Sequence, residues 1–97
     1  MPTPGTSGTP VADTNQVSIV NFAFSPSSLS IKVGTTVTWT NNASMAHTAT
    51  SSSGPTAFDS GSLGSGQTFS FTFSSAGTWN YRCSFHSSMT GTITVTN

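Results

Sequence analysis

The chain has 97 residues, of which two are basic and two acidic, so the formal net charge is zero. Two dispersed cations cannot neutralise a phosphate backbone or form a basic amphipathic face, so we expect neither nucleic-acid binding nor membrane insertion. The length favours one domain, and 33% hydrophobic and 10% aromatic residues suffice for a compact β-rich core.

The first fifteen residues, MPTPGTSGTPVADTN, are rich in Pro, Gly, Thr and Ser. This composition is typical of a flexible linker or a ragged terminus. We therefore predict a flexible segment over 1–15 and a folded domain over 16–97. No signal peptide and no transmembrane stretch is visible in the sequence.

Beyond residue 16, apolar and polar side chains alternate, which is the pattern of half-buried β-strands. A slip near Asn21 in the first such segment is interpreted as a β-bulge. The long loop 52–66 separates the middle strands, and Phe58 and Leu63 are expected to attach it to the core. The segments with this pattern are 17–24, 29–33, 36–40, 47–51, 67–73, 78–83 and 91–96.

No segment shows a helical period of 3.6 residues. Seven to eight short strands in one domain predict an all-β fold, a Greek-key β-sandwich of two sheets. The alternating stripe of Phe69, Phe71 and Phe73 is assigned to its core.

The residues with metal-binding chemistry are few and concentrated. Cys83, His86 and Met89 lie within one predicted turn, and His47 follows the Asn-rich run 40–46 on another hairpin. Soft thiolate and thioether ligands stabilise Cu(I), and imidazole binds both oxidation states of copper. Two His and one Cys with a weak axial Met is the arrangement used for electron transfer, so we predict that these four residues bind one copper ion.

These motifs resemble the cupredoxins, particularly plastocyanin and amicyanin. In that family a first His follows an Asn-rich loop, and Cys-x-x-His precedes a Met; here Thr-Trp-Thr-Asn-Asn precedes His47, and Asn-Tyr-Arg-Cys-Ser-Phe-His precedes Met89. The resemblance covers about residues 17–97. It implies a cupredoxin-like fold and a type 1 blue copper protein that shuttles single electrons, with the edge of His86 facing solvent. It also implies that the Ala46 carbonyl lies on the axial side opposite the Met.

Two positions depart from the family pattern. Thr48 stands where many members have an Asn that ties the two ligand loops together, so the tie is expected to be weaker. Phe85 stands where many have Pro, and its N–H is expected to add a donor near the sulfur.

The expected partners are a redox protein donor and a redox protein acceptor of unknown identity. Phe85, Met89, Ala46 and Phe58 are predicted to form an apolar docking ring around His86. With so few charges, electrostatic steering should be slight. Arg82 is expected to point outward, opposite to Cys83.

Other functions agree less well with these residues than electron transfer. A Cys–His hydrolase lacks a third orienting group, and a structural zinc site favours closed Cys and His sets without Met. A copper chaperone or storage domain and a non-metal β-sandwich adhesion module remain as alternatives. We expect no enzymatic activity, a monomer, and a periplasmic or extracellular location with tethering through the N-terminal segment as an option.

Overall fold

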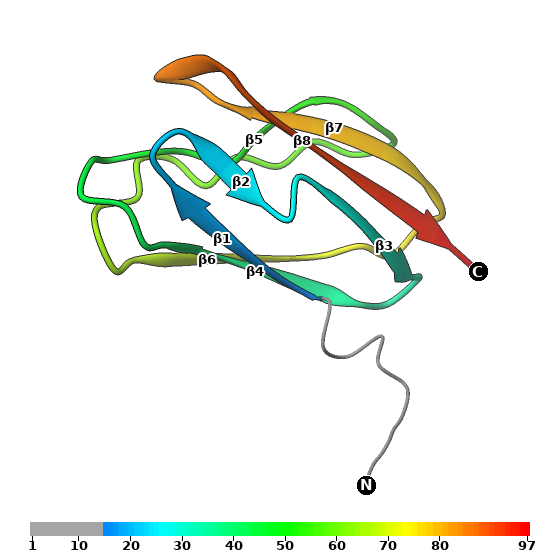
Figure 1. The fold of residues 1–97 in the computed structure, drawn as a ribbon. Helices are drawn as coiled ribbons and strands as arrows, with labels where there is room; N and C mark the ends of the chain where they lie inside the picture. Colours follow the sequence, from blue (N-terminus) through cyan, green and yellow to red (C-terminus); the bar gives the residue numbers. More distant parts are fainter. Residues whose placement is uncertain (1–14) are drawn as a thin grey trace, which may run out of the picture.

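The computed structural model describes residues 15–97, so residues 1–14 of the predicted flexible segment 1–15 lie outside the described residues. Within residues 15–97, eight strands form two four-stranded sheets that pack as a sandwich (Figure 1). This confirms the predicted all-β sandwich of seven to eight strands. Residues 15–97 contain no helix long and apolar enough to cross a membrane. The strands are β1 (Gln16–Val20), β2 (Ala23–Ser25), β3 (Ser28–Lys32), β4 (Thr36–Asn41), β5 (Thr50–Ser53), β6 (Thr68–Thr72), β7 (Gly77–Cys83) and β8 (His86–Thr96).

The two sheets are mixed rather than purely antiparallel. One has the strand order β2-β1-β4-β6, in which β1 pairs parallel with β4, and the other has the order β3-β8-β7-β5, in which β3 pairs parallel with β8. The chain therefore crosses from one sheet to the other several times. These crossings place residues that are distant in sequence at the same end of the sandwich.

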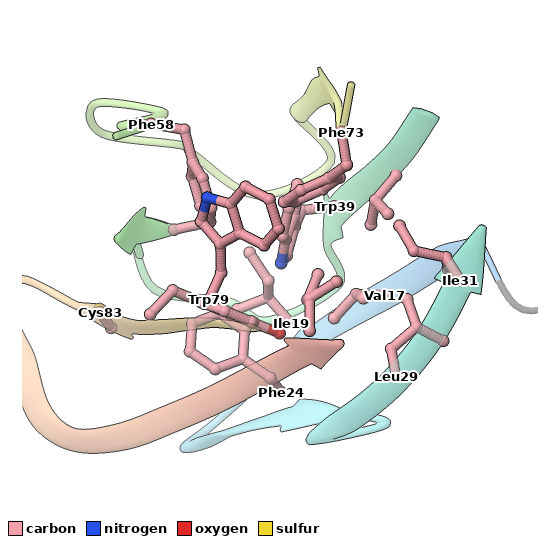
Figure 2. Close-up of a cluster of buried hydrophobic side chains, with 14 of the residues drawn as sticks. Val17, Ile19, Phe24, Leu29, Ile31, Trp39, Phe58, Phe73, Trp79 and Cys83 are labelled. Carbon is pink, nitrogen blue, oxygen red and sulfur yellow. The ribbon is translucent and has the colours of Figure 1, made fainter. Parts of the chain in front are cut away.

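Aromatic rings fill the space between the sheets (Figure 2). Trp39 on β4 is fully buried, and its ring lies 5.2 Å from Phe58 and 5.5 Å from Tyr81 of the opposite sheet. Tyr81 packs directly over Gly91, where an added Cβ would overlap the tyrosine ring. The glycine is thus required by close packing. Phe58 and Leu63 are both buried, as predicted for the long loop.

Three predicted element boundaries were wrong. Residues 17–24 do not form one bulged strand, because the chain turns at Asn21–Phe22 and β1 pairs antiparallel with β2. The strand expected at 47–51 begins only at Thr50. The last strand begins at His86 rather than at residue 91, so the segment between β7 and β8 is a tight turn of two residues.

Three connections meet at one end of the sandwich, on the left of Figure 1. They are the β1–β2 turn, the loop between β4 and β5, and the β7–β8 turn. All the candidate metal ligands predicted from the sequence lie in or beside these connections.

Candidate metal centre

The sequence-predicted histidines and cysteine come together in the structure. The ligand atoms of His47, Cys83 and His86 all lie within 4.8 Å of one another. The Cys83 Sγ is 3.6 Å from Nδ1 of His47 and 3.8 Å from Nδ1 of His86. His47 and Cys83 are fully buried, and His86 is partly exposed.

These distances fit a metal ion bound by all three side chains. Typical metal–nitrogen and metal–sulfur distances of about 2.0 and 2.3 Å, at an angle of 120°, put the nitrogen and sulfur about 3.7 Å apart. Both observed sulfur–nitrogen distances agree with this value. The donor set of one thiol and two imidazoles therefore has the composition and spacing of a trigonal site, which copper favours when a thioether is also near.

The backbone of His47 is held by a bridge to the long loop. Its N–H donates to the Leu63 carbonyl at 3.0 Å, and the Leu63 N–H donates back to the His47 carbonyl at 2.8 Å. Because Leu63 is itself buried, this bridge connects the histidine backbone to the core. His47 is thereby positioned by the sandwich and not by its own loop alone.

The buried Asn41 organises the loop that leads to His47. Its amide Nδ2 donates to the carbonyls of Met45 and Leu63, at 2.9 and 2.8 Å, and its Oδ1 accepts from the Ala43 N–H at 2.8 Å. A fully buried amide is tolerated because its hydrogen-bonding groups are paired. The Asn-rich run therefore has a structural role that the motif alone did not specify.

A register irregularity brings His86 to Cys83. Along β7 and β8, Arg82 pairs with Thr90, but the next residue, Cys83, pairs with His86. The three residues 87–89 are thus accommodated without ladder partners on β7. Irregularities of this kind bend a strand and redirect its side chains, and they are common beside functional sites. Here the irregularity allows residues three apart in sequence to face one another.

Met89 is buried near the start of β8, as expected for a side chain that faces the site rather than solvent. Its role as axial ligand stays a prediction, as does that of the Ala46 carbonyl. Arg82 is exposed while Cys83 is buried, which confirms that the arginine points outward.

Thr48 ties the two ligand loops together through its backbone and its side chain. Its N–H donates to the Cys83 Sγ at 3.4 Å, and its hydroxyl accepts from the Ser84 N–H at 2.7 Å. The connection between the two ligand loops is therefore present, although Thr48 stands where many family members have the Asn that forms it. Among the hydrogen bonds of the described residues, the Thr48 N–H is the one backbone donor to the Cys83 sulfur. The sequence had instead suggested the N–H of Phe85 as a donor near this sulfur.

The Thr48 hydroxyl continues into a directed network. Thr50 donates its hydroxyl hydrogen to Asp59 Oδ1 at 3.0 Å. Because that hydrogen is used, Thr50 must accept the hydroxyl hydrogen of Thr48, 3.0 Å away. The hydrogen bonds therefore run in one direction: from the Ser84 N–H to the Thr48 hydroxyl, from there to the Thr50 hydroxyl, and finally to the Asp59 carboxylate.

We expect Thr48→Val to destabilise the metal-free protein by about 1–3 kcal/mol, because the partly buried Ser84 N–H loses its acceptor. Urea unfolding of the metal-free protein measures this difference. Thr36→Val is the matched control, since it removes a hydroxyl from an exposed pair with Thr72. Equal losses in the two variants would contradict the proposed tie.

Burial lowers the pKa of His47 below 6.5, and the nearby His86 lowers it further. The unfolded chain therefore takes up a proton near pH 6.5, whereas folded His47 does so only at lower pH. The stability due to neutral His47 is fully present above pH 6.5 and is lost as the pH falls from there through the folded-state pKa.

The metal-free protein is accordingly expected to lose stability on acidification, by at most about 1.4 kcal/mol per pH unit from this group. Urea unfolding at pH 7, 6 and 5 measures the slope. His47→Gln should flatten it. A stability of the parent protein that does not change over this range would contradict the expectation.

Two residues at the site were not identified from the sequence. The Asn21 Oδ1 lies 3.0 Å from Nε2 of His47, and the Phe22 ring lies 4.9 Å from that of His86. Their only sequence signal was the slip in the first strand. Conversely, Phe58 and Met89 are buried, so they cannot belong to an exposed apolar ring, and that part of the prediction was wrong.

The fold and this donor set together define a class of protein, a β-sandwich with a Cys–His₂ donor set at one end. The sequence profile of the copper binding proteins of the plastocyanin/azurin family matches residues 11–96. Amicyanin-alpha from Methylorubrum extorquens is 34% identical over 87 residues, which cover 87% of this chain and 73% of that protein.

Solved structures of copper proteins are also similar to this chain. A purple cupredoxin from Nitrosopumilus maritimus superposes with a TM-score of 0.77 at 36% identity, over 84% of this chain and 98% of that one. A copper-containing nitrite reductase (NirK) from Thermus scotoductus SA-01 superposes with a TM-score of 0.80 at 33% identity over 84% of this chain, which spans only 22% of that protein. The chain belongs to the copper-binding plastocyanin/azurin family, the cupredoxins, and is an electron-transfer copper protein.

Proposed function

We propose that His47, Cys83, His86 and Met89 hold one type 1 copper ion and that electrons enter and leave through the exposed edge of His86. The carrying observation is the difference in exposure between the ligands. His47 and Cys83 are fully buried, whereas His86 reaches the surface at the end of the sandwich. An imidazole that touches both the site and solvent provides the shortest path between them.

When bound, copper would supply the one-electron Cu(II)/Cu(I) couple. The protein contributes a fixed arrangement of donors, because the ligands come from two connections that are hydrogen-bonded to each other and to the core. A preorganised site changes little between oxidation states, so little energy is spent on reorganisation. Burial of Cys83 excludes water from the thiolate, and the Thr48 N–H stabilises its charge.

The surface around His86 supports an uncharged docking mode for the redox donor and acceptor. Phe22, Phe85 and Met45 are exposed at this end. The charged residues of 15–97 are Arg82 on the outward side of β7, Asp59, whose carboxylate accepts from the Thr50 hydroxyl, and Lys32, which bonds to Asn97. Association with a redox partner should therefore depend weakly on ionic strength. A steep salt dependence would exclude this docking mode.

Addition of Cu(II) to the metal-free protein tests the proposal. We expect one equivalent to bind and to give an intense blue colour that disappears on reduction and returns on oxidation. A colourless protein without stoichiometric binding would refute the proposed ligand set. A green colour would indicate a stronger axial bond and revise the role of Met89.

A copper chaperone or storage domain is the remaining alternative, and a competing chelator distinguishes it. An electron carrier keeps Cu(I) through repeated redox cycles, whereas a chaperone releases it readily. The two buried ligands favour retention. Rapid transfer of Cu(I) to the chelator would favour the chaperone.

We also propose that the domain works in the periplasm or outside the cell, with tethering through its N-terminal segment as the finer hypothesis. The hydroxyl-rich, nearly uncharged composition and the relationship to amicyanin support this location. Fractionation of cells that express the native gene tests it, and recovery in the cytoplasmic fraction would exclude it.

A further inference from the structure

The β1–β2 turn contacts both histidine side chains of the centre, although it contributes no ligand. Its two residues, Asn21 and Phe22, each make a different contact. The Asn21 Oδ1 is 3.0 Å from His47 Nε2. The Phe22 ring lies 4.9 Å from the His86 ring and, edge-on, 6.3 Å from the His47 ring.

The contact of Asn21 determines which His47 nitrogen carries the proton. An amide oxygen only accepts hydrogen bonds, so Nε2 must be protonated and Nδ1 must be the free base. Nδ1 is the nitrogen that faces the Cys83 sulfur at 3.6 Å. In the other tautomer a proton would occupy the position that a metal ion needs.

The Asn21 amide makes a second contact with the loop that leads to His47. Its Nδ2 donates to the Ser44 hydroxyl oxygen, 3.4 Å away. Asn21 therefore connects the β1–β2 turn to the His47 loop and to the imidazole at the same time.

Phe22 restrains the other imidazole. Its side chain is 55% exposed, and its ring lies 4.9 Å from the His86 ring at an interplanar angle of 55°. Of the two histidines and the cysteine, His86 is the one that is not fully buried. The turn thus lies over both histidines, one by a hydrogen bond and the other by ring packing.

We propose that Asn21 and Phe22 are positioning residues for the metal centre: Asn21 selects the Nε2–H tautomer of His47, and Phe22 restrains the His86 ring, so that the site is formed before the metal enters. This inference rests on the proposed ligand set. Groups that orient metal-binding histidines commonly contribute 10–100-fold to metal affinity.

Asn21→Leu tests the role of the amide, because it keeps the size of the side chain and removes the acceptor. We expect copper affinity to fall 10–100-fold and the Nε2–H tautomer of His47 to lose its predominance in long-range ¹H–¹⁵N spectra of the metal-free protein. Asn21→Asp, which keeps an acceptor oxygen, should restore both. Asn42→Leu is the matched control, since Asn42 bonds Ser18 and not a histidine.

The tautomer measurement separates this inference from the proposed function. If Asn21→Leu leaves both the tautomer and the copper affinity of the parent protein unchanged, the role of Asn21 is refuted. If the parent protein binds no copper, the ligand set fails, yet the metal-free spectra still decide whether Asn21 selects the tautomer. A change in affinity that Asn42→Leu reproduces would reduce Asn21 to a general structural residue and overturn the inference.

Phe22→Ala tests the ring contact. We expect a chelator to remove copper several-fold faster from this variant, because the His86 ring gains freedom. Phe85→Ala is the control: Phe85 is 54% exposed and adjacent to His86 in sequence, but its ring takes part in none of the ring contacts found in residues 15–97. Equal removal rates for Phe22→Ala and the parent protein would overturn the role of Phe22.

Discussion

Cys83→Ser is expected to abolish the blue colour completely while leaving the fold intact. In the proposed site the thiolate would be the soft ligand that stabilises Cu(I). A serine hydroxyl has nearly the same size but does not ionise near neutral pH, so it cannot replace the sulfur. Cys83 is fully buried, and both imidazoles face its Sγ, so no other side chain can take its position. Titration with Cu(II) followed by visible absorption measures the loss.

The control for this prediction moves the thiol by one residue. In the double variant Cys83→Ser with Ser84→Cys, the thiol lies at an exposed position on the other side of the chain. We expect this variant to remain colourless, because residue 84 lies in the exposed turn after β7 and its side chain is directed to Thr50, whose hydroxyl is 3.1 Å from that of Ser84. An intense colour in Cys83→Ser, or its recovery in the double variant, would show that the ligand assignment is wrong.

Trp39→Ala is expected to lower the free energy of unfolding by about 3–5 kcal/mol, because the indole is large and fully buried. The indole bridges the two sheets and is in contact with several rings: those of Phe58, Phe69 and Phe73, and that of Tyr81 on β7. Removing it leaves a cavity that the surrounding rings cannot fill. Because small domains have a total stability of about 5–15 kcal/mol, this loss brings the protein close to unfolding.

Urea unfolding of the metal-free variants measures the effect of Trp39. Val33→Ala is the matched control, because Val33 is among the exposed apolar residues and should change stability by no more than about 0.5 kcal/mol. Trp39→Phe should fall between the two, since it retains part of the ring contacts. A loss below about 1 kcal/mol for Trp39→Ala would contradict the bridging role of the indole.

Local pattern and residue chemistry were sufficient to predict the fold class and the three residues that meet at the centre. Alternation of apolar side chains is a property of each strand by itself, so it can be recognised without knowing the partners of the strand. The ligand prediction was made easier by the small number of cysteine and histidine residues. The chain has one cysteine and two histidines, so a centre that needs all three leaves no choice among them.

Predictions that required knowledge of pairing were less successful. The turn at Asn21 was interpreted as a bulge, because one slip in the alternation is compatible with either a bulge or a tight hairpin. The start of β8 at His86 was missed, because residues 87–89 interrupt the ladder without a clear change in composition. Phe58 and Met89 were predicted to belong to an apolar ring around His86, but both are buried, as the prediction of Phe58 as an anchor of the long loop required.

The sequence by itself determined what the centre is made of: an all-β chain in which one thiol, two imidazoles and a thioether are available for a soft metal. Tertiary structure decided how those groups are held. The contacts of Asn21 with His47, of Phe22 with His86 and of Thr48 with Ser84 join residues separated by 26, 64 and 36 positions. Such contacts depend on which strands pair and where the chain crosses between the sheets, and no local pattern of side chains encodes that choice.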